Sequence, residues 1–118
     1  MNVLGLDIGG ANLKAAAIDG TTLSLPFPLW KQPEQLSAVL REETARHFPP
    51  AFDMVALTMT AELADCFQTK SDGVRFVIDA VREAFPETPL RIWLTSGEFA
   101  EPADAVEVAA TPGRPRPL

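Results

Sequence analysis

The chain has 118 residues, of which 47% are hydrophobic and 22% charged, and this balance is typical of one compact globular domain. Its formal net charge is −6 and it has no basic patch, so nucleic acid is not an expected partner. No apolar run approaches the roughly 20 residues that span a bilayer, the N-terminus lacks the features of a secretory leader, and the single cysteine excludes an internal disulfide. We therefore expect a cytoplasmic protein without membrane contact.

The N-terminal residues predict two strands joined by a tight turn. Residues 3–8 are a short apolar run, and Gly9-Gly10 after it is a turn signal. A second apolar run at 13–18 ends at Asp19-Gly20, which is a strong hairpin signal. The chain should therefore reverse direction twice within its first 20 residues.

The next segment predicts an edge strand and a helix. Residues 22–30 are strand-like but contain Pro26 and Pro28. Because proline cannot donate to a strand ladder, this third strand should lie at the edge of the sheet. Pro33 then opens a predicted helix that runs to about His47.

The remaining elements alternate between strand and helix. A short buried strand is expected at 54–58 and another at 90–94. Between them, apolar residues at helical spacing predict a helix over 74–85, with Ser71-Asp72-Gly73 as its cap and Pro86 as its stop.

The predicted order is therefore β-β-β-α-β-α-β. It indicates an α/β fold with a mixed sheet of five strands and helices packed on it. The first three strands should be antiparallel, and the later two, each reached through a helix, should run parallel to the first. Residues 1–100 should form this unit. Residues 101–118 are rich in proline and lack apolar periodicity, which predicts an extended tail.

The first turn is a candidate phosphate and metal site. Asp7 lies near the end of the first strand, where a carboxylate can hold Mg²⁺ through its waters. Gly9 and Gly10 let backbone N–H groups approach a phosphate without a Cβ in the way. Lys14 offers a point charge, and Asn12 favours the turn. The alternatives are a plain hairpin with a turn aspartate and a solvated lysine.

A second polar group follows the fourth predicted strand. Thr58, Thr60, Glu62 and Asp65 come where that strand ends. Ligands of α/β sheets bind at the carboxyl ends of strands, so Thr58 and Thr60 are further candidates for cofactor binding. An exposed helical turn is the structural alternative for Glu62.

The strand order and the acid-Gly-Gly turn resemble the first subdomain of the actin/hexokinase/heat-shock-chaperone ATPase superfamily, whose sheet is ribonuclease H-like. Residues 7–14 (DIGGANLK) together with 58–67 (TMTAELADCF) resemble, more narrowly, the hydantoinase A-related proteins linked to tetrahydromethanopterin-dependent C1 transfer. One branch of that family is a synthase of methanofuran biosynthesis, which joins an aminomethylfuran unit to a glutamyl-tyramine unit. The match covers residues 1–100.

The resemblance implies an enzyme that binds ATP or a pyrophosphate ester with Mg²⁺ at the turn. It would transfer a phosphoryl group, or displace pyrophosphate by an attacking amine. Sugar kinases with a similar fold have a general base in the region of Glu62 and Asp65, so either carboxylate could deprotonate an attacking amine or hydroxyl. Family members are much longer, and this chain has no second acid-Gly-Gly turn. We therefore expect it to supply an N-terminal portion that is too short to be active alone.

Two other functions remain open. The chain could be a non-catalytic module whose exposed apolar surface associates with a second copy or with a missing C-terminal half. It could also be a kinase for a small metabolite, as the superfamily turn alone would permit. Residues 58–67 argue against the kinase, because they lack the glycine-rich approach to the base that such kinases usually show.

Overall fold

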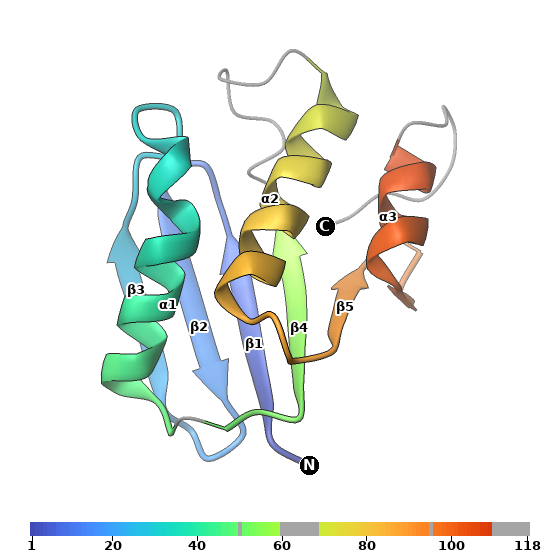
Figure 1. Ribbon diagram of the computed structural model, residues 1–118. Helices are drawn as coiled ribbons and strands as arrows, with labels where there is room; N and C mark the ends of the chain where they lie inside the picture. Colours follow the sequence, from blue (N-terminus) through green and yellow to red (C-terminus); the bar gives the residue numbers. More distant parts are fainter. Residues whose placement is uncertain (50, 60–68, 95, 110–118) are drawn as a thin grey trace.

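The computed structural model describes residues 1–49, 51–59, 69–94 and 96–109 (Figure 1). Within these ranges the chain forms a six-stranded mixed sheet in the order β3-β2-β1-β4-β5-β6, with three α-helices. The elements are β1 (Val3–Ile8), β2 (Asn12–Ala17), β3 (Thr22–Pro26), a 3₁₀ turn (Pro33–Gln35), α1 (Leu36–His47), β4 (Met54–Met59), α2 (Lys70–Ala84), β5 (Leu90–Trp93), β6 (Phe99–Ala100) and α3 (Pro102–Ala109).

The predicted α/β class and the directions of the first five strands are confirmed. Strands β1, β2 and β3 form an antiparallel meander, and β3 lies at the edge of the sheet, as its prolines require. Strands β4 and β5 add to the other side of β1, and both run parallel to it. The first strand of the chain therefore lies inside the sheet, with β2 on one side and β4 on the other.

Two predictions about the later residues were wrong. The sheet has a sixth strand, because β6 turns back antiparallel to β5 through Gly97, which has a φ of +85°. Residues 102–109, expected to be extended, form helix α3. Pro102 is its first residue, where the fixed φ of proline suits a helix and the missing N–H costs no hydrogen bond. Ala105 is fully buried, and the Arg91 guanidinium pairs at 3.1 Å with Glu101 just before the helix.

The cap of α2 also differs from the prediction. Thr69 is the capping residue, and its Oγ1 accepts a hydrogen bond from the Asp72 N–H at 3.1 Å. Ser71, Asp72 and Gly73 consequently lie inside the first turn of the helix rather than before it. The extended backbone of Thr69, with φ −132° and ψ 162°, is the conformation that a capping residue normally has.

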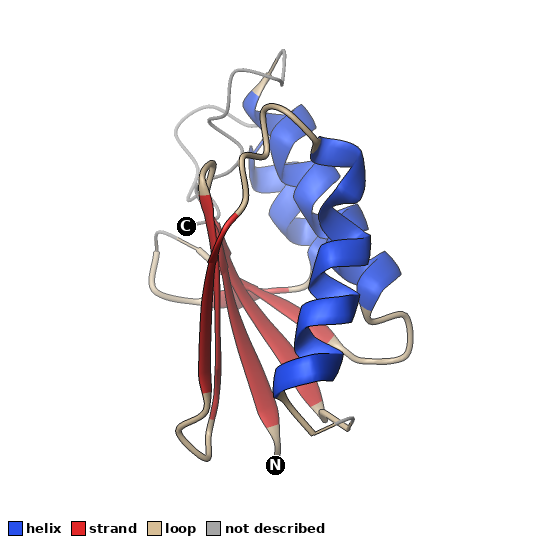
Figure 2. Ribbon diagram, turned by 90° about the vertical axis from the view of Figure 1, so that its left-hand side faces the viewer, coloured by secondary structure: helices blue, strands red, loops and turns tan. Residues whose placement is uncertain are grey.

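The helices cover one face of the sheet (Figure 2). Alternate residues of each strand point towards them, and α2 contributes an apolar stripe at helical spacing. The core consists mainly of these side chains: Leu4, Leu6, Ile8, Leu36, Leu40, Val55, Leu57, Met59, Val74, Val77, Ile78, Val81 and Ile92. Among the described residues, none forms a helix over the opposite face of the sheet.

The β2–β3 connection is the predicted Asp-Gly hairpin. Gly20 has a φ of +94°, which is the left-handed region that favours glycine. The Asp19 carboxylate accepts a hydrogen bond from the Thr21 N–H at 2.9 Å. Hydrogen bonding from the backbone and side chain of Thr21 lowers the pKa of Asp19 below its usual 3.8.

Candidate functional site

A row of polar side chains crosses the sheet on the face opposite the helices. Asp7 of β1 lies directly across from Lys14 of β2 on one side and from Thr58 of β4 on the other. Lys14 in turn lies across from Ser24 of β3. Since directly paired residues point to the same face and lie about 5 Å apart at Cβ, these four side chains are immediate neighbours. Asp7, Lys14 and Ser24 are exposed, and Thr58 is half-buried.

The turn between β1 and β2 is held by the chain that follows β3. The Phe27 N–H donates to the Ala11 carbonyl at 2.8 Å, and the Leu29 N–H donates to the Gly10 carbonyl at 3.1 Å. Both Phe27 and Leu29 are buried, so the core anchors these two donors. The turn is further closed by the Gly9 N–H, which donates to the Asn12 carbonyl at 3.0 Å.

The described residues leave the backbone of this turn accessible. None of their atoms would lie within 4 Å of a Cβ built on Gly10, so they do not block the approach of a ligand there. Gly9 and Gly10 do not adopt a positive φ, so the turn does not depend on glycine for its backbone angles. We therefore attribute the glycine at position 10 to the access that it gives a ligand to the backbone. Asn12 is exposed at the start of β2, where it pairs with Pro26.

A hollow of about 560 Å³ lies beside the polar row. Its floor is the next row of the sheet, in which Gly5 lies directly across from Ala16 and Ala56. These three residues have almost no side chain, so the sheet surface is low there. Asp7, Lys14 and Thr58 border the hollow on one side.

Two aromatic rings border the same hollow from β5 and β6. Trp93 and Phe99 pack edge to face, with ring centroids 4.8 Å apart and planes at 65°. Trp93 is half-buried, whereas 53% of Phe99 is exposed. This hollow is not predicted by the sequence analysis. The signal was available in β1 and β4, whose alternate residues on this face include Gly5 and Ala56.

The donor set at the row fits a hydrated Mg²⁺ better than a metal held by protein ligands alone. Within the described residues, no cluster of three His, Cys, Asp or Glu side chains could hold a metal ion. Asp7 is a single carboxylate, and Mg²⁺ commonly binds through one or two carboxylates together with waters and phosphate oxygens. The Thr58 hydroxyl donates a long hydrogen bond of 3.4 Å to the Leu6 carbonyl of the neighbouring strand β1.

The structure thus brings together three of the predicted site residues, Asp7, Lys14 and Thr58, and places Gly9, Gly10 and Asn12 at the adjoining turn. The predicted positions Thr60, Glu62 and Asp65 lie outside the described residues. Ser96 to Glu98 belong to the β5–β6 connection, where the Leu94 N–H donates to the Glu98 carbonyl at 2.8 Å.

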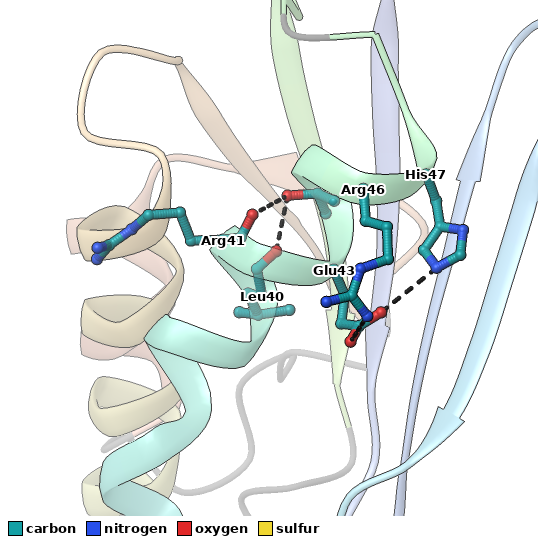
Figure 3. A network of polar contacts seen from close by, with 6 residues as sticks. Leu40, Arg41, Glu43, Arg46 and His47 are labelled. Carbon is teal, nitrogen blue, oxygen red and sulfur yellow. Dashed lines mark hydrogen bonds and ion pairs between the residues drawn. The ribbon is translucent and has the colours of Figure 1, made fainter.

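A separate polar network at the end of α1 has a structural explanation (Figure 3). The Glu43 carboxylate contacts Arg46 Nη1 at 3.2 Å and His47 Nε2 at 3.4 Å. The Thr44 hydroxyl donates to the Leu40 carbonyl at 2.7 Å. All these groups belong to helix α1, and basic residues in the last turn of a helix interact favourably with its dipole. The network therefore stabilises the end of α1.

Comparison with known proteins gives one informative match. No family model matches the chain. In an alignment of 106 residues that covers 87% of this chain, it is 40% identical to the (4-{4-[2-(gamma-L-glutamylamino)ethyl]phenoxymethyl}furan-2-yl)methanamine synthase of Methanocaldococcus jannaschii. The aligned part is 30% of that synthase, so this chain spans less than a third of the relative's length. None of the helices in the described ranges is both long and apolar enough to cross a membrane.

Proposed function

We propose that the chain is the phosphate- and metal-binding part of an enzyme of C1-carrier metabolism, of the methanofuran-linked type. The observation that carries the proposal is the row formed by Asp7, Lys14 and Thr58 beside an open Gly10 turn, in a chain 40% identical to a furan-methanamine synthase. An ATPase-type fold is part of the proposal. It is supported by the strand order β3-β2-β1-β4-β5 with β3 antiparallel at the edge.

Each residue of the row has a role in this proposal. Asp7 holds the waters of Mg²⁺, which neutralises charge on phosphate oxygens when bound. The backbone around Gly9 and Gly10 approaches the phosphate, and Asn12 supports the turn. Lys14 lies directly across from Asp7 and adds a positive charge on the phosphate side. Thr58 lies directly across from Asp7 at the same end of the sheet, and Thr60 is a further cofactor-binding candidate from the sequence.

The relative's printed name also bears on the reaction. The compound in that name contains a phenoxymethyl group, which is an ether between a phenol oxygen and a methylene carbon. That name favours an oxygen nucleophile over the amine expected from sequence. In the proposed reaction the phenol oxygen bonds to the methylene carbon, and the carbon–oxygen bond to pyrophosphate breaks. Pyrophosphate leaves with the electron pair, and Glu62 or Asp65 takes the phenol proton.

The test is a titration of the ¹⁵N-labelled chain with Mg²⁺ and pyrophosphate, followed by amide chemical shifts. This readout detects dissociation constants near 1 mM, about 4 kcal/mol of binding, and so tolerates an incomplete site. We expect the Gly9, Gly10 and Lys14 amides to move only when both Mg²⁺ and pyrophosphate are present. ATP with Mg²⁺ should move the same amides if a nucleotide is the ligand.

The matched variants are Asp7→Asn and Asp79→Asn. Asp79 is an exposed carboxylate on α2, so its loss changes the net charge equally but leaves the polar row intact. Asp7→Asn should abolish the Mg²⁺ dependence of the shifts, and Asp79→Asn should keep it. Shifts that are absent at about 10 mM ligand, or that survive in Asp7→Asn, would remove the proposed site.

A further inference from the structure

A tryptophan that is not part of the core follows the chain segment that holds the β1–β2 turn. Trp30 is 56% exposed, whereas Phe27 and Leu29 just before it are buried. The Leu29 N–H donates to the Gly10 carbonyl at 3.1 Å. With standard backbone dimensions, the Trp30 Cα therefore lies within about 8.5 Å of that carbonyl oxygen. The indole is thus attached close to the backbone to which the proposed function assigns the phosphate.

The backbone that carries Trp30 is held in a defined turn. The Lys31 N–H donates to the Pro28 carbonyl at 3.0 Å, so that Trp30 occupies the third position of a four-residue turn. The Gln32 N–H donates to the same carbonyl at 3.3 Å. Because this backbone is already ordered, a ligand that stacks on the indole would cost the chain little conformational freedom.

Lysine side chains gather at the same end of the sheet. Lys31 Nζ lies 5.0 Å from the centroid of the Trp30 ring, which is a cation–π contact. Lys14 comes shortly after the β1–β2 turn, and Lys70 opens α2, whose first turn lies at this end of the sheet in Figure 1. These are all the lysines of a chain whose net charge is −6. Such local positive charge beside a flat apolar ring suits an anion that is joined to an aromatic group.

We infer that Trp30 is the stacking residue for the ring of an aromatic diphosphate ligand, with Lys31 beside the diphosphate. The inference rests on the proposed function, because the diphosphate must lie on the Gly9-Gly10 turn with Mg²⁺. Trp30 then adds selectivity for the ring to the affinity that the turn provides for the diphosphate. An arylmethyl diphosphate and a nucleoside diphosphate both have this chemistry.

The experiment follows the amide and indole N–H shifts of the ¹⁵N-labelled full chain with Mg²⁺ and one of three ligands: inorganic pyrophosphate, methyl diphosphate or benzyl diphosphate. All three should move the Gly9 and Gly10 amides. Benzyl diphosphate alone should also move the Trp30 indole N–H, and it should bind at least about fivefold tighter than methyl diphosphate because its ring stacks on the indole. ADP in a parallel titration distinguishes the two sources of the ring, since the natural class should show the larger Trp30-dependent gain.

Variants locate the ring. Trp30→Leu should remove the gain of benzyl over methyl diphosphate and keep the shifts with pyrophosphate. Phe99→Leu is the matched control, because Phe99 is 53% exposed but belongs to β6 at the other edge of the sheet, and it should keep the gain. Lys31→Gln should weaken all three ligands about threefold, whereas Arg41→Gln, an equal change of charge in the middle of α1, should not.

The outcomes separate this inference from the proposed function. Gly9 and Gly10 amides that stay in place with every ligand would remove the proposed function and the Trp30 assignment with it. If those amides move but benzyl and methyl diphosphate bind equally, or if Trp30→Leu keeps the gain, the Trp30 assignment alone is overturned. A gain that is lost in Phe99→Leu instead would place the ring beside β6 and overturn it as well. Circular dichroism confirms that each variant is folded.

Discussion

One hydroxyl group caps the N-terminus of helix α2, and removing that hydroxyl should lower the stability of the protein by a predictable amount. Thr69 Oγ1 accepts the Asp72 N–H at 3.1 Å, and Thr69 is exposed. Replacing a capping threonine by alanine typically costs about 1 kcal/mol. Because water can partly replace the hydroxyl at an exposed cap, we expect Thr69→Ala to lower the free energy of unfolding by about 0.5–1 kcal/mol.

The same loss of free energy predicts a shift in the melting temperature. An unfolding entropy of about 2.1 cal/mol/K per residue gives roughly 0.25 kcal/mol/K for 118 residues. The midpoint of Thr69→Ala should therefore fall by about 2–4 °C. Differential scanning calorimetry, paired with urea unfolding monitored by circular dichroism, measures both quantities.

Two controls separate the cap from its neighbours. Thr69→Ser keeps the hydroxyl and should retain most of the stability. Ser71→Ala removes a hydroxyl 3.3 Å from that of Thr69 but leaves the cap in place, so it should change stability by less than about 0.5 kcal/mol. If Ser71→Ala costs more than Thr69→Ala, the helix is capped by Ser71 and the reasoning from the Thr69 geometry fails.

The hairpin, the first turn and the sheet core supply further expected outcomes. Gly20→Ala should cost about 1 kcal/mol in urea unfolding because of its φ of +94°, whereas Gly10→Ala, in open space without a positive φ, should stay within about 0.5 kcal/mol. Asp19 has a pKa lowered below 3.8, so the stability that it contributes is present above pH 3.8 and is lost as the pH falls through its folded pKa. The difference in melting temperature between the wild type and Asp19→Ala should therefore shrink as the pH is lowered from 7 to 2. A difference that stays constant would contradict a stabilising role of the ionised Asp19 carboxylate. Leu57→Ala, at a fully buried position, should cost about 2–5 kcal/mol, and a loss below 1 kcal/mol would mean that β4 is not central to the core.

The early strands could be predicted from sequence because their signals are local. Asp19-Gly20 fixes a hairpin by its backbone preference, and Pro26 places β3 at an edge because it cannot donate. Strand β6 has two residues, too few to show any alternation. Helix α3 is not predicted because the proline content of residues 101–118 indicates an extended chain, although a proline such as Pro102 also suits the first position of a helix.

The candidate site was predictable in part for the same reason. The pairing of Asp7 with Lys14 follows from the position of the turn between β1 and β2, which is a local feature. The place of Thr58 depends on the parallel register of β1 and β4, which no neighbouring residue specifies. The hollow depends on four or more strands at once, because its floor and its aromatic border come from different ends of the chain.

The central position of β1 also constrains the order of folding. The β1–β2 hairpin can form as soon as about 20 residues are available, but the other edge of β1 waits for β4. The Asn2 N–H, for example, donates at 2.6 Å to Asp53, 51 residues later. Such distant pairing raises contact order and slows folding. Until α1 has formed and β4 has docked, an apolar strand edge with unpaired N–H and C=O groups is exposed, and that edge is where misassembly between partly folded chains would begin.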